Sequence, residues 1–186
     1  ELHHSAPGRL LQKGEVLTAS GLEACLRALC DEHIALTPIT PPDDARWQPV
    51  QAQMPELAPD ERVVFMGHGA THHAFSAYAC LDHMLTTQNI PALVGAVESY
   101  PEIESVIERL RRESVRKVHL MPLMLVAGDH AINDMASDEE DSWKTLLHQA
   151  GIDAQPWLQG LGENPLIQQM FVDHLQAVIE QAEEAA

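Results

Sequence analysis

The sequence is poor in positive charge. Its 186 residues include 11 Lys and Arg against 28 Asp and Glu, so the formal net charge is -17 at pH 7. A field of this sign repels polyanions, which argues against general binding to nucleic acid or to an anionic membrane surface. It attracts metal cations weakly, as almost any acidic protein does.

Long apolar runs are missing, and cysteines are few. Because no run of eighteen apolar residues occurs, we expect no membrane span. Because no charged and then apolar leader opens the sequence, we expect no secretory signal. The three cysteines, Cys25, Cys30 and Cys80, have no metal-knuckle spacing. They are predicted to be buried thiols in a reducing compartment, which favours the cytoplasm.

Two common catalytic motifs are also missing. Gly67-His68-Gly69 lacks the lysine and the spacing of a phosphate-binding loop. No nucleophile-elbow serine supports a serine hydrolase. The chain is nevertheless 45% hydrophobic, so it can bury a core, and its length suits one full domain and part of another.

From residue 61 onward, short apolar runs alternate with segments of helical periodicity. Strands are predicted at 62–66, 92–97, 118–126 and 152–158, and helices at 75–88, from Pro101 to about 112, at 142–149 and at 164–183. This alternation predicts an α/β fold with a parallel four-stranded sheet flanked by helices. Residues 55–60, rich in proline and acid, are predicted to be a linker between residues 1–54 and 61–186. In the last helix one apolar face is expected, formed by Ile167, Met170, Phe171, Leu175, Val178 and Ile179.

Three of the predicted strands end in side chains that can ligate a metal. His68 follows the first, Glu98 the second and His130 the third. If these strands are parallel neighbours, their carboxyl ends meet at one edge of the sheet, where ligands bind in open α/β folds. Two imidazoles and one carboxylate suit a divalent first-row metal, and three protein ligands leave coordination positions open. The trio is therefore a candidate metal site.

Small and polar residues beside the trio are candidates for contacting a substrate. Gly67, Gly69 and Gly128 allow sharp turns and a close approach of a ligand. Met124 is expected at the lip of the site, and Asp129 is expected to contact the substrate or to orient an imidazole.

Plainer interpretations stay open for each of these residues. A lone histidine after a strand is most often a surface or capping residue, and Glu98 suits the amino end of the next helix. The glycines alone are ordinary turn residues. His72 and His73 are either auxiliary ligands and proton carriers or caps of the following helix.

Several segments, in order and with matching spacing, resemble the sirohydrochlorin cobaltochelatases of the CbiK type from the anaerobic pathway. The resemblance runs from about Met54 to the carboxyl terminus and rests on Val64 to Gly69, Gly95 to Pro101, Leu120 to Asp134, Asp141 to Lys144 and Gly160 to Pro165. It implies a class II chelatase with a ferrochelatase-like fold of two similar α/β domains and a cleft between them. It also implies insertion of Co²⁺, as metal substrate, into sirohydrochlorin on the way to cobalamin, without a redox cofactor.

The resemblance places the metal ligands on His68, Glu98 and His130 and proton transfer on His68 or His130. It also implies that most of an amino-terminal domain is missing, with residues 1–54 as its remnant. Ser5-Ala6-Pro7-Gly8 stands where the family has an acidic segment.

Alternatives to cobalt insertion therefore remain. In the first alternative, the chain is a non-catalytic fragment that binds metal or tetrapyrrole. In the second, it is a chelatase for Fe²⁺ or Ni²⁺. Pairing of two chains as a homo-oligomer could rebuild a cleft.

Overall fold

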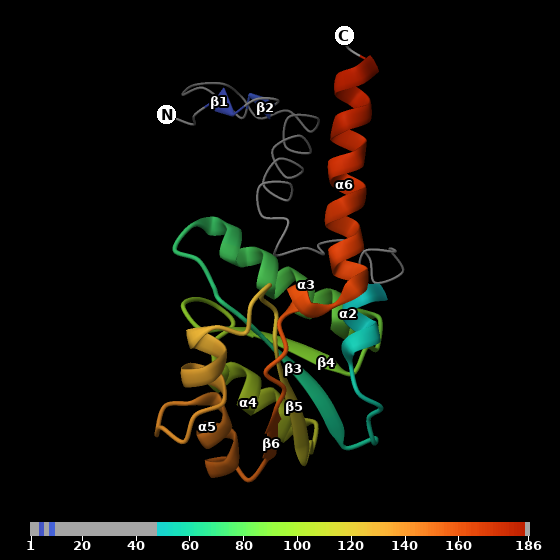
Figure 1. Ribbon diagram of the computed structural model, residues 1–186. Coiled ribbons are helices and arrows are strands. Elements are labelled where there is room, and N and C mark those ends of the chain that lie inside the picture. Colours follow the sequence, from blue (N-terminus) through green and yellow to red (C-terminus); the bar gives the residue numbers. More distant parts are fainter. Residues whose placement is uncertain (1–3, 6–7, 10–47, 185–186) are drawn as a thin grey trace. The chain divides into compact units, whose positions relative to one another are not determined.

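A computed structural model describes residues 4–5, 8–9 and 48–184 (Figure 1). The chain divides into two compact units, residues 1–37 and 38–186. In the first unit, strands β1 (His4–Ser5) and β2 (Gly8–Arg9) pair antiparallel. Most of the predicted remnant, including Cys25 and Cys30, lies outside the described residues.

The second unit contains the remaining described elements, which alternate between strand and helix. In chain order they are α2 (Gln48–Gln53), β3 (Glu61–Gly67), the 3₁₀ helix η2 (His73–Phe75), α3 (Ser76–Thr87), β4 (Ala92–Ala96), α4 (Ile103–Arg112), β5 (Lys117–Pro122), the π-helix η3 (His130–Met135), α5 (Trp143–Gln149), β6 (Asp153–Pro156), the 3₁₀ helix η4 (Leu161–Glu163) and α6 (Pro165–Glu184).

Strands β3 to β6 form one parallel sheet in the order β4-β3-β5-β6, which confirms the predicted fold class. Two strands end earlier than predicted, β5 at Pro122 and β6 at Pro156. Proline has no backbone N–H to donate, so it ends a ladder of hydrogen bonds readily. From β3 the chain goes to β4 on one side and then to β5 on the other, so β3 is the point where the strand order reverses.

Helices cover both faces of the sheet (Figure 1). Helices α4 and α5 bury their apolar side chains in one core with Val64, Met66 and Leu120 from the strands. On α3, Tyr78, Leu81 and Leu85 are the buried residues. Because both faces are covered, the central strands are apolar at almost every position, as in other parallel sheets.

Of the helix starts at α4 and α5, the first differs from the prediction and the second agrees with it. Helix α4 begins at Ile103 with Glu102 as its N-cap, so the prediction that Pro101 opens this helix is wrong. The predicted start of α5 is correct to one residue, because Ser142 is the N-cap and its hydroxyl accepts a hydrogen bond from the N–H of Thr145 at 3.2 Å.

The apolar face of α6 is only partly buried. The predicted helix is confirmed and Ile167 is buried, but further along Phe171, Leu175, Val178 and Ile179 are 43 to 62% exposed. Cys80 is also exposed, so the prediction of a buried thiol is wrong there. Among the described helices, none is long and apolar enough to cross a bilayer.

Helix α2 belongs to the same compact unit as the sheet. Val50 is 1% exposed, and the side-chain amide of Asn164 donates a hydrogen bond to the carbonyl of Pro49 at 2.8 Å. The predicted linker at residues 55–60 therefore joins α2 to β3 inside one unit, and the boundary between units lies earlier, at residues 37–38.

A buried histidine links β5 to β3 and to the residue that follows β6. His119 of β5 is 4% exposed, and its Nδ1 accepts a hydrogen bond from the indole N–H of Trp157 at 3.1 Å. Its Nε2 therefore carries the proton and donates to the carboxylate of Glu61 on β3, also at 3.1 Å. This hydrogen bond, with the charge of Lys117, lowers the pKa of Glu61 below its ordinary value.

The lowered pKa of Glu61 predicts acid sensitivity of the fold. A group whose pKa is lower in the folded chain stabilises the fold above its unfolded pKa, and this contribution is lost as pH falls through the folded value. We therefore expect the unfolding midpoint in urea to decrease with falling pH below about 4.5, and less steeply in Glu61→Gln. The matched control is Glu140→Gln, an exposed acid. Equal pH slopes for wild type and Glu61→Gln would contradict this account.

Candidate metal centre

The pairing of β3 with β4 continues past the ends of both strands. Val97 donates its backbone N–H to the carbonyl of Gly67, and Glu98 donates to the carbonyl of His68, each at 3.0 Å. These two bonds hold the backbone of His68 beside that of Glu98. The side chains therefore leave neighbouring strands at the same edge of the sheet.

The loop that carries His68 is held by Tyr78 of α3. The N–H of Gly69 donates a hydrogen bond to the hydroxyl of Tyr78 at 3.2 Å. Burial raises the pKa of Tyr78, so the hydroxyl stays neutral. A Cβ at Gly67 would collide with the Tyr78 ring, and Gly69 has a φ of +94°, which side chains rarely tolerate. Both glycines are thus required by the backbone that positions His68.

His130 reaches the same edge from the segment that follows β5. It is the first residue of η3, in which Ala131 and Met135 are fully buried. These two anchors fix the π-helix against the core and leave His130 at the rim. π-Helical turns are rare and often occur at functional sites.

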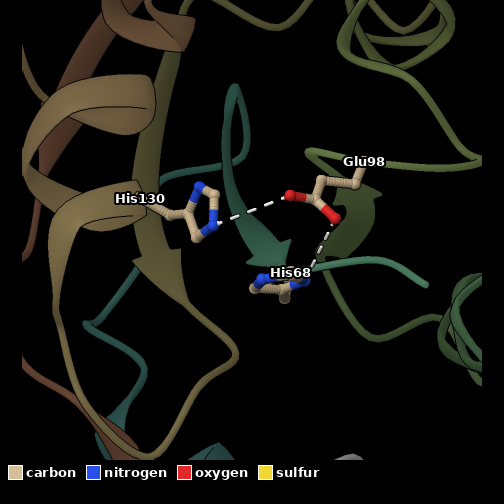
Figure 2. A group of neighbouring side chains, drawn as sticks. All are labelled: His68, Glu98 and His130. Carbon is tan, nitrogen blue, oxygen red and sulfur yellow. Dashed lines mark ion pairs between the residues drawn. The ribbon is translucent and has the colours of Figure 1, made fainter. Parts of the chain in front are cut away.

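Figure 2 shows that His68, Glu98 and His130 converge as the corners of a triangle, with one ion pair from the carboxylate of Glu98 to each imidazole. One oxygen of Glu98 lies 3.8 Å from Nδ1 of His68, and the other lies 4.0 Å from Nε2 of His130. The two rings meet edge to face with centroids 4.6 Å apart. One potential ligand atom from each residue lies within 4.8 Å of the others.

The geometry fits one ion after a small adjustment. Two donor atoms bonded to the same ion at about 2.1 Å are at most about 4.2 Å apart, so the side chains need to close by about half an ångström. The side chains of His68, Glu98 and His130 are 47, 46 and 32% exposed. An ion can therefore reach them from solvent, and coordination positions remain for another ligand.

Charge is distributed unevenly between the two edges of the sheet. Arg62, Arg109 and Lys117 lie at the amino edge, at the starts of β3 and β5 and the end of α4, each within 4.0 Å of an acid. At the opposite edge, the described cation Lys144 is already paired with Asp138 at 2.6 Å. The site edge thus favours a cation over an anion.

Other candidate residues from the sequence lie around this edge in different settings. Gly128 has open space around it, and Asp129 is exposed, with no capping hydrogen bond from its side chain. Met124 is partly buried against the core. Their contact with a substrate stays a prediction. The sequence leaves the roles of His72 and His73 undecided. His72 is a helix cap, since its Nδ1 accepts a hydrogen bond from the backbone N–H of Ala74.

Asp134 was not among the predicted site residues. Its Oδ2 lies 2.6 Å from Nδ1 of His130. Asp134 therefore makes the contact with an imidazole that is expected of Asp129 from the sequence. The spacing of four residues could have indicated this pair, because such residues are neighbours on a helix surface. The sequence pattern, however, predicts no helix over residues 130–135, so it does not place Asp134 beside His130.

Comparison with known proteins gives one family over most of the chain. The family described as "Cobalt chelatase (CbiK)" matches residues 42–180. The chain is 66% identical over 139 residues to the sirohydrochlorin cobaltochelatase of Salmonella typhimurium, covering 75% of this chain and 53% of that protein. It is 36% identical over 121 residues to the sirohydrochlorin cobaltochelatase CbiKC of Nitratidesulfovibrio vulgaris, covering 65% and 43%.

The chain spans about half the length of these chelatase relatives. A separate similarity, 46% identity over 57 residues, connects 31% of this chain with 5% of the RecBCD enzyme subunit RecB of Escherichia coli. So small a share of RecB transfers no activity. Because the chelatase match starts at residue 42, most of residues 1–54 lies outside it, and their origin as a domain remnant stays a prediction.

The collision between Gly67 and Tyr78 gives a test of how the site is positioned. Gly67→Ala should lower the free energy of unfolding by about 1–3 kcal/mol, the usual cost of overpacking. Gly128→Ala, on the same edge with open space around it, should change it by less than about 0.5 kcal/mol. Urea unfolding measures both, and an equal effect of the two substitutions would contradict the packing described.

Proposed function

Because the chain belongs to the cobalt chelatase (CbiK) family, we propose that it inserts Co²⁺ into sirohydrochlorin, the early cobalt insertion of anaerobic cobalamin biosynthesis in the cytoplasm. The observation that supports this most is the convergence of His68, Glu98 and His130 on a volume that one ion can fill. The chain covers only 53% and 43% of the two relatives with this printed activity, so the activity is proposed rather than transferred.

In this proposal the metal ion moves from the protein to the macrocycle. Co²⁺ exchanges bonds to His68, Glu98 and His130 for bonds to four pyrrole nitrogens, and two N–H protons leave the ring. Neutral imidazole accepts a proton near neutral pH, so His68 and His130 can each take one once the metal has left. No electron is transferred, and no redox cofactor is needed.

The donor set also limits the metal. Imidazole and carboxylate bind Co²⁺, Fe²⁺ and Ni²⁺, and the affinity order alone does not select among them. Co²⁺ is preferred here because both chelatase relatives are named for cobalt. Half-exposed ligands suit a site that releases its ion better than a closed structural site does.

The tetrapyrrole requires a surface facing the metal. We place it against the edge formed by Gly67, Gly69, Met124, Gly128 and Asp129, with the unit of residues 38–186, rather than 61–186 alone, as the carboxyl-terminal chelatase domain. The relatives are long enough to supply a second wall from their other half. For this chain a second copy in a homo-oligomer is the proposed substitute.

Removing one ligand tests the assignment. His68→Ala, Glu98→Ala and His130→Ala should each weaken Co²⁺ binding and slow the Co²⁺-dependent loss of free sirohydrochlorin by at least about tenfold, the lower end of what outer-sphere substitutions cost. His83→Ala, an exposed histidine on α3, is the control. Retained activity in His130→Ala with an intact far-UV spectrum would remove the assignment.

A second candidate is a metal or tetrapyrrole carrier without turnover, which is favoured because the chain covers only 53% of its chelatase relative. The visible spectrum of sirohydrochlorin, titrated with this chain and then with Co²⁺, separates the two functions. A chelatase should convert the free spectrum to the cobalt spectrum at a rate proportional to protein concentration. Binding without protein-dependent conversion would contradict the proposed turnover and support the carrier.

A further inference from the structure

We propose that Asp134 is a positioning residue that fixes the tautomer of His130, so that Nε2 presents its lone pair to the ion. This inference rests on the proposed function and adds a residue to the same site. The observation behind it is the 2.6 Å contact between Oδ2 of Asp134 and Nδ1 of His130. On the other side of the ring, Nε2 faces Glu98 at 4.0 Å.

The chemistry of the contact determines where the imidazole proton lies. An ionised carboxylate only accepts hydrogen bonds, and a neutral imidazole has one N–H. A hydrogen bond to Asp134 therefore requires the proton on Nδ1, and Nε2 is left as the acceptor. In water the other tautomer is the commoner one for histidine, with Nε2 protonated and unable to bind metal. Asp134 reverses this preference at the atom that faces Glu98.

The fold holds both partners of this hydrogen bond in place. They lie four residues apart on η3, whose buried residues Ala131 and Met135 anchor the turn in the core. His130 and Asp134 remain partly exposed on the outer side, at 32 and 45%. A surface pair at this spacing contributes little to stability. The main effect of this hydrogen bond is therefore to orient the imidazole ring of His130.

The other imidazole of the site is oriented differently. Nδ1 of His68 lies 3.1 Å from the carbonyl oxygen of Gly69 and 3.8 Å from Glu98. It thus has a neutral backbone acceptor where His130 has a carboxylate. A carboxylate partner makes the imidazole a stronger donor to metal. Substitution at Asp134 should consequently act on His130 and leave His68 unchanged.

Asp129 provides a matched control. It immediately precedes His130 and carries the same charge, but its side chain is exposed and makes no cap hydrogen bond. Asp129→Asn and Asp134→Asn remove one negative charge each from the same edge. A difference between them therefore reports the hydrogen bond rather than the net charge.

The test combines histidine tautomers with metal affinity in the full chain. Long-range ¹H–¹⁵N spectra of the metal-free protein at pH 8, above the ordinary histidine pKa of about 6.5, should show His130 protonated on Nδ1. Asp134→Ala should move the proton toward Nε2 and raise the Kd for Co²⁺ by about 10- to 100-fold. Asp134→Asn should shift both in the same direction, and Asp129→Asn should match wild type in these two measurements, which contain no sirohydrochlorin.

The outcomes separate this inference from the proposed function. If His130→Ala weakens Co²⁺ binding while Asp134→Ala and Asp134→Asn bind like Asp129→Asn, only the role of Asp134 is overturned. An unchanged His130 tautomer in Asp134→Ala overturns it as well. If His130→Ala itself binds Co²⁺ like wild type, the metal site fails. Should Asp134→Ala lose its far-UV signal, the Asp134→Asn variant alone decides.

Discussion

The parallel register of β3 with its two neighbours places the groups of the candidate site. Five residues of β3 pair with β4 and six with β5, and the hydrogen bonds from Val97 and Glu98 extend the first ladder beyond both strands. On the other side, Leu123 donates to the carbonyl of Met66 at 2.8 Å. A shift of one residue in either ladder would move a side chain to the other face of the sheet.

Charged groups away from the site and at the site have different physical roles. Away from the site, Asp82 of α3 accepts hydrogen bonds from the N–H of Val94 and from Arg109, at 3.0 and 2.7 Å, which ties α3 to β4 and α4. Charges there are neutralised within the fold. At the carboxyl edge, Glu98 faces two imidazoles that are charged only if protonated. A bound dication would supply the missing positive charge.

Much of this arrangement could be predicted because it depends on short-range patterns. Apolar runs ending in Gly67 and Glu98 predict strands buried on both faces, and parallel strands bring their carboxyl ends together. The sequence could not show where η3 begins, because Asp129 and Asp134 are equally plausible partners of an imidazole until the helical phase is known. The exposure of Cys80 and of the second half of α6 depends on which surfaces the tertiary structure covers, and apolar spacing does not report that.

The central claim is that two imidazoles and one carboxylate bind a common ion. X-ray absorption of the chain loaded with one equivalent of Co²⁺ tests it most directly, because imidazole rings give a distinctive multiple-scattering signal. We expect two imidazole ligands in the wild-type protein, one in His68→Ala and one in His130→Ala. A spectrum without imidazole, or one that neither substitution changes, would contradict the account.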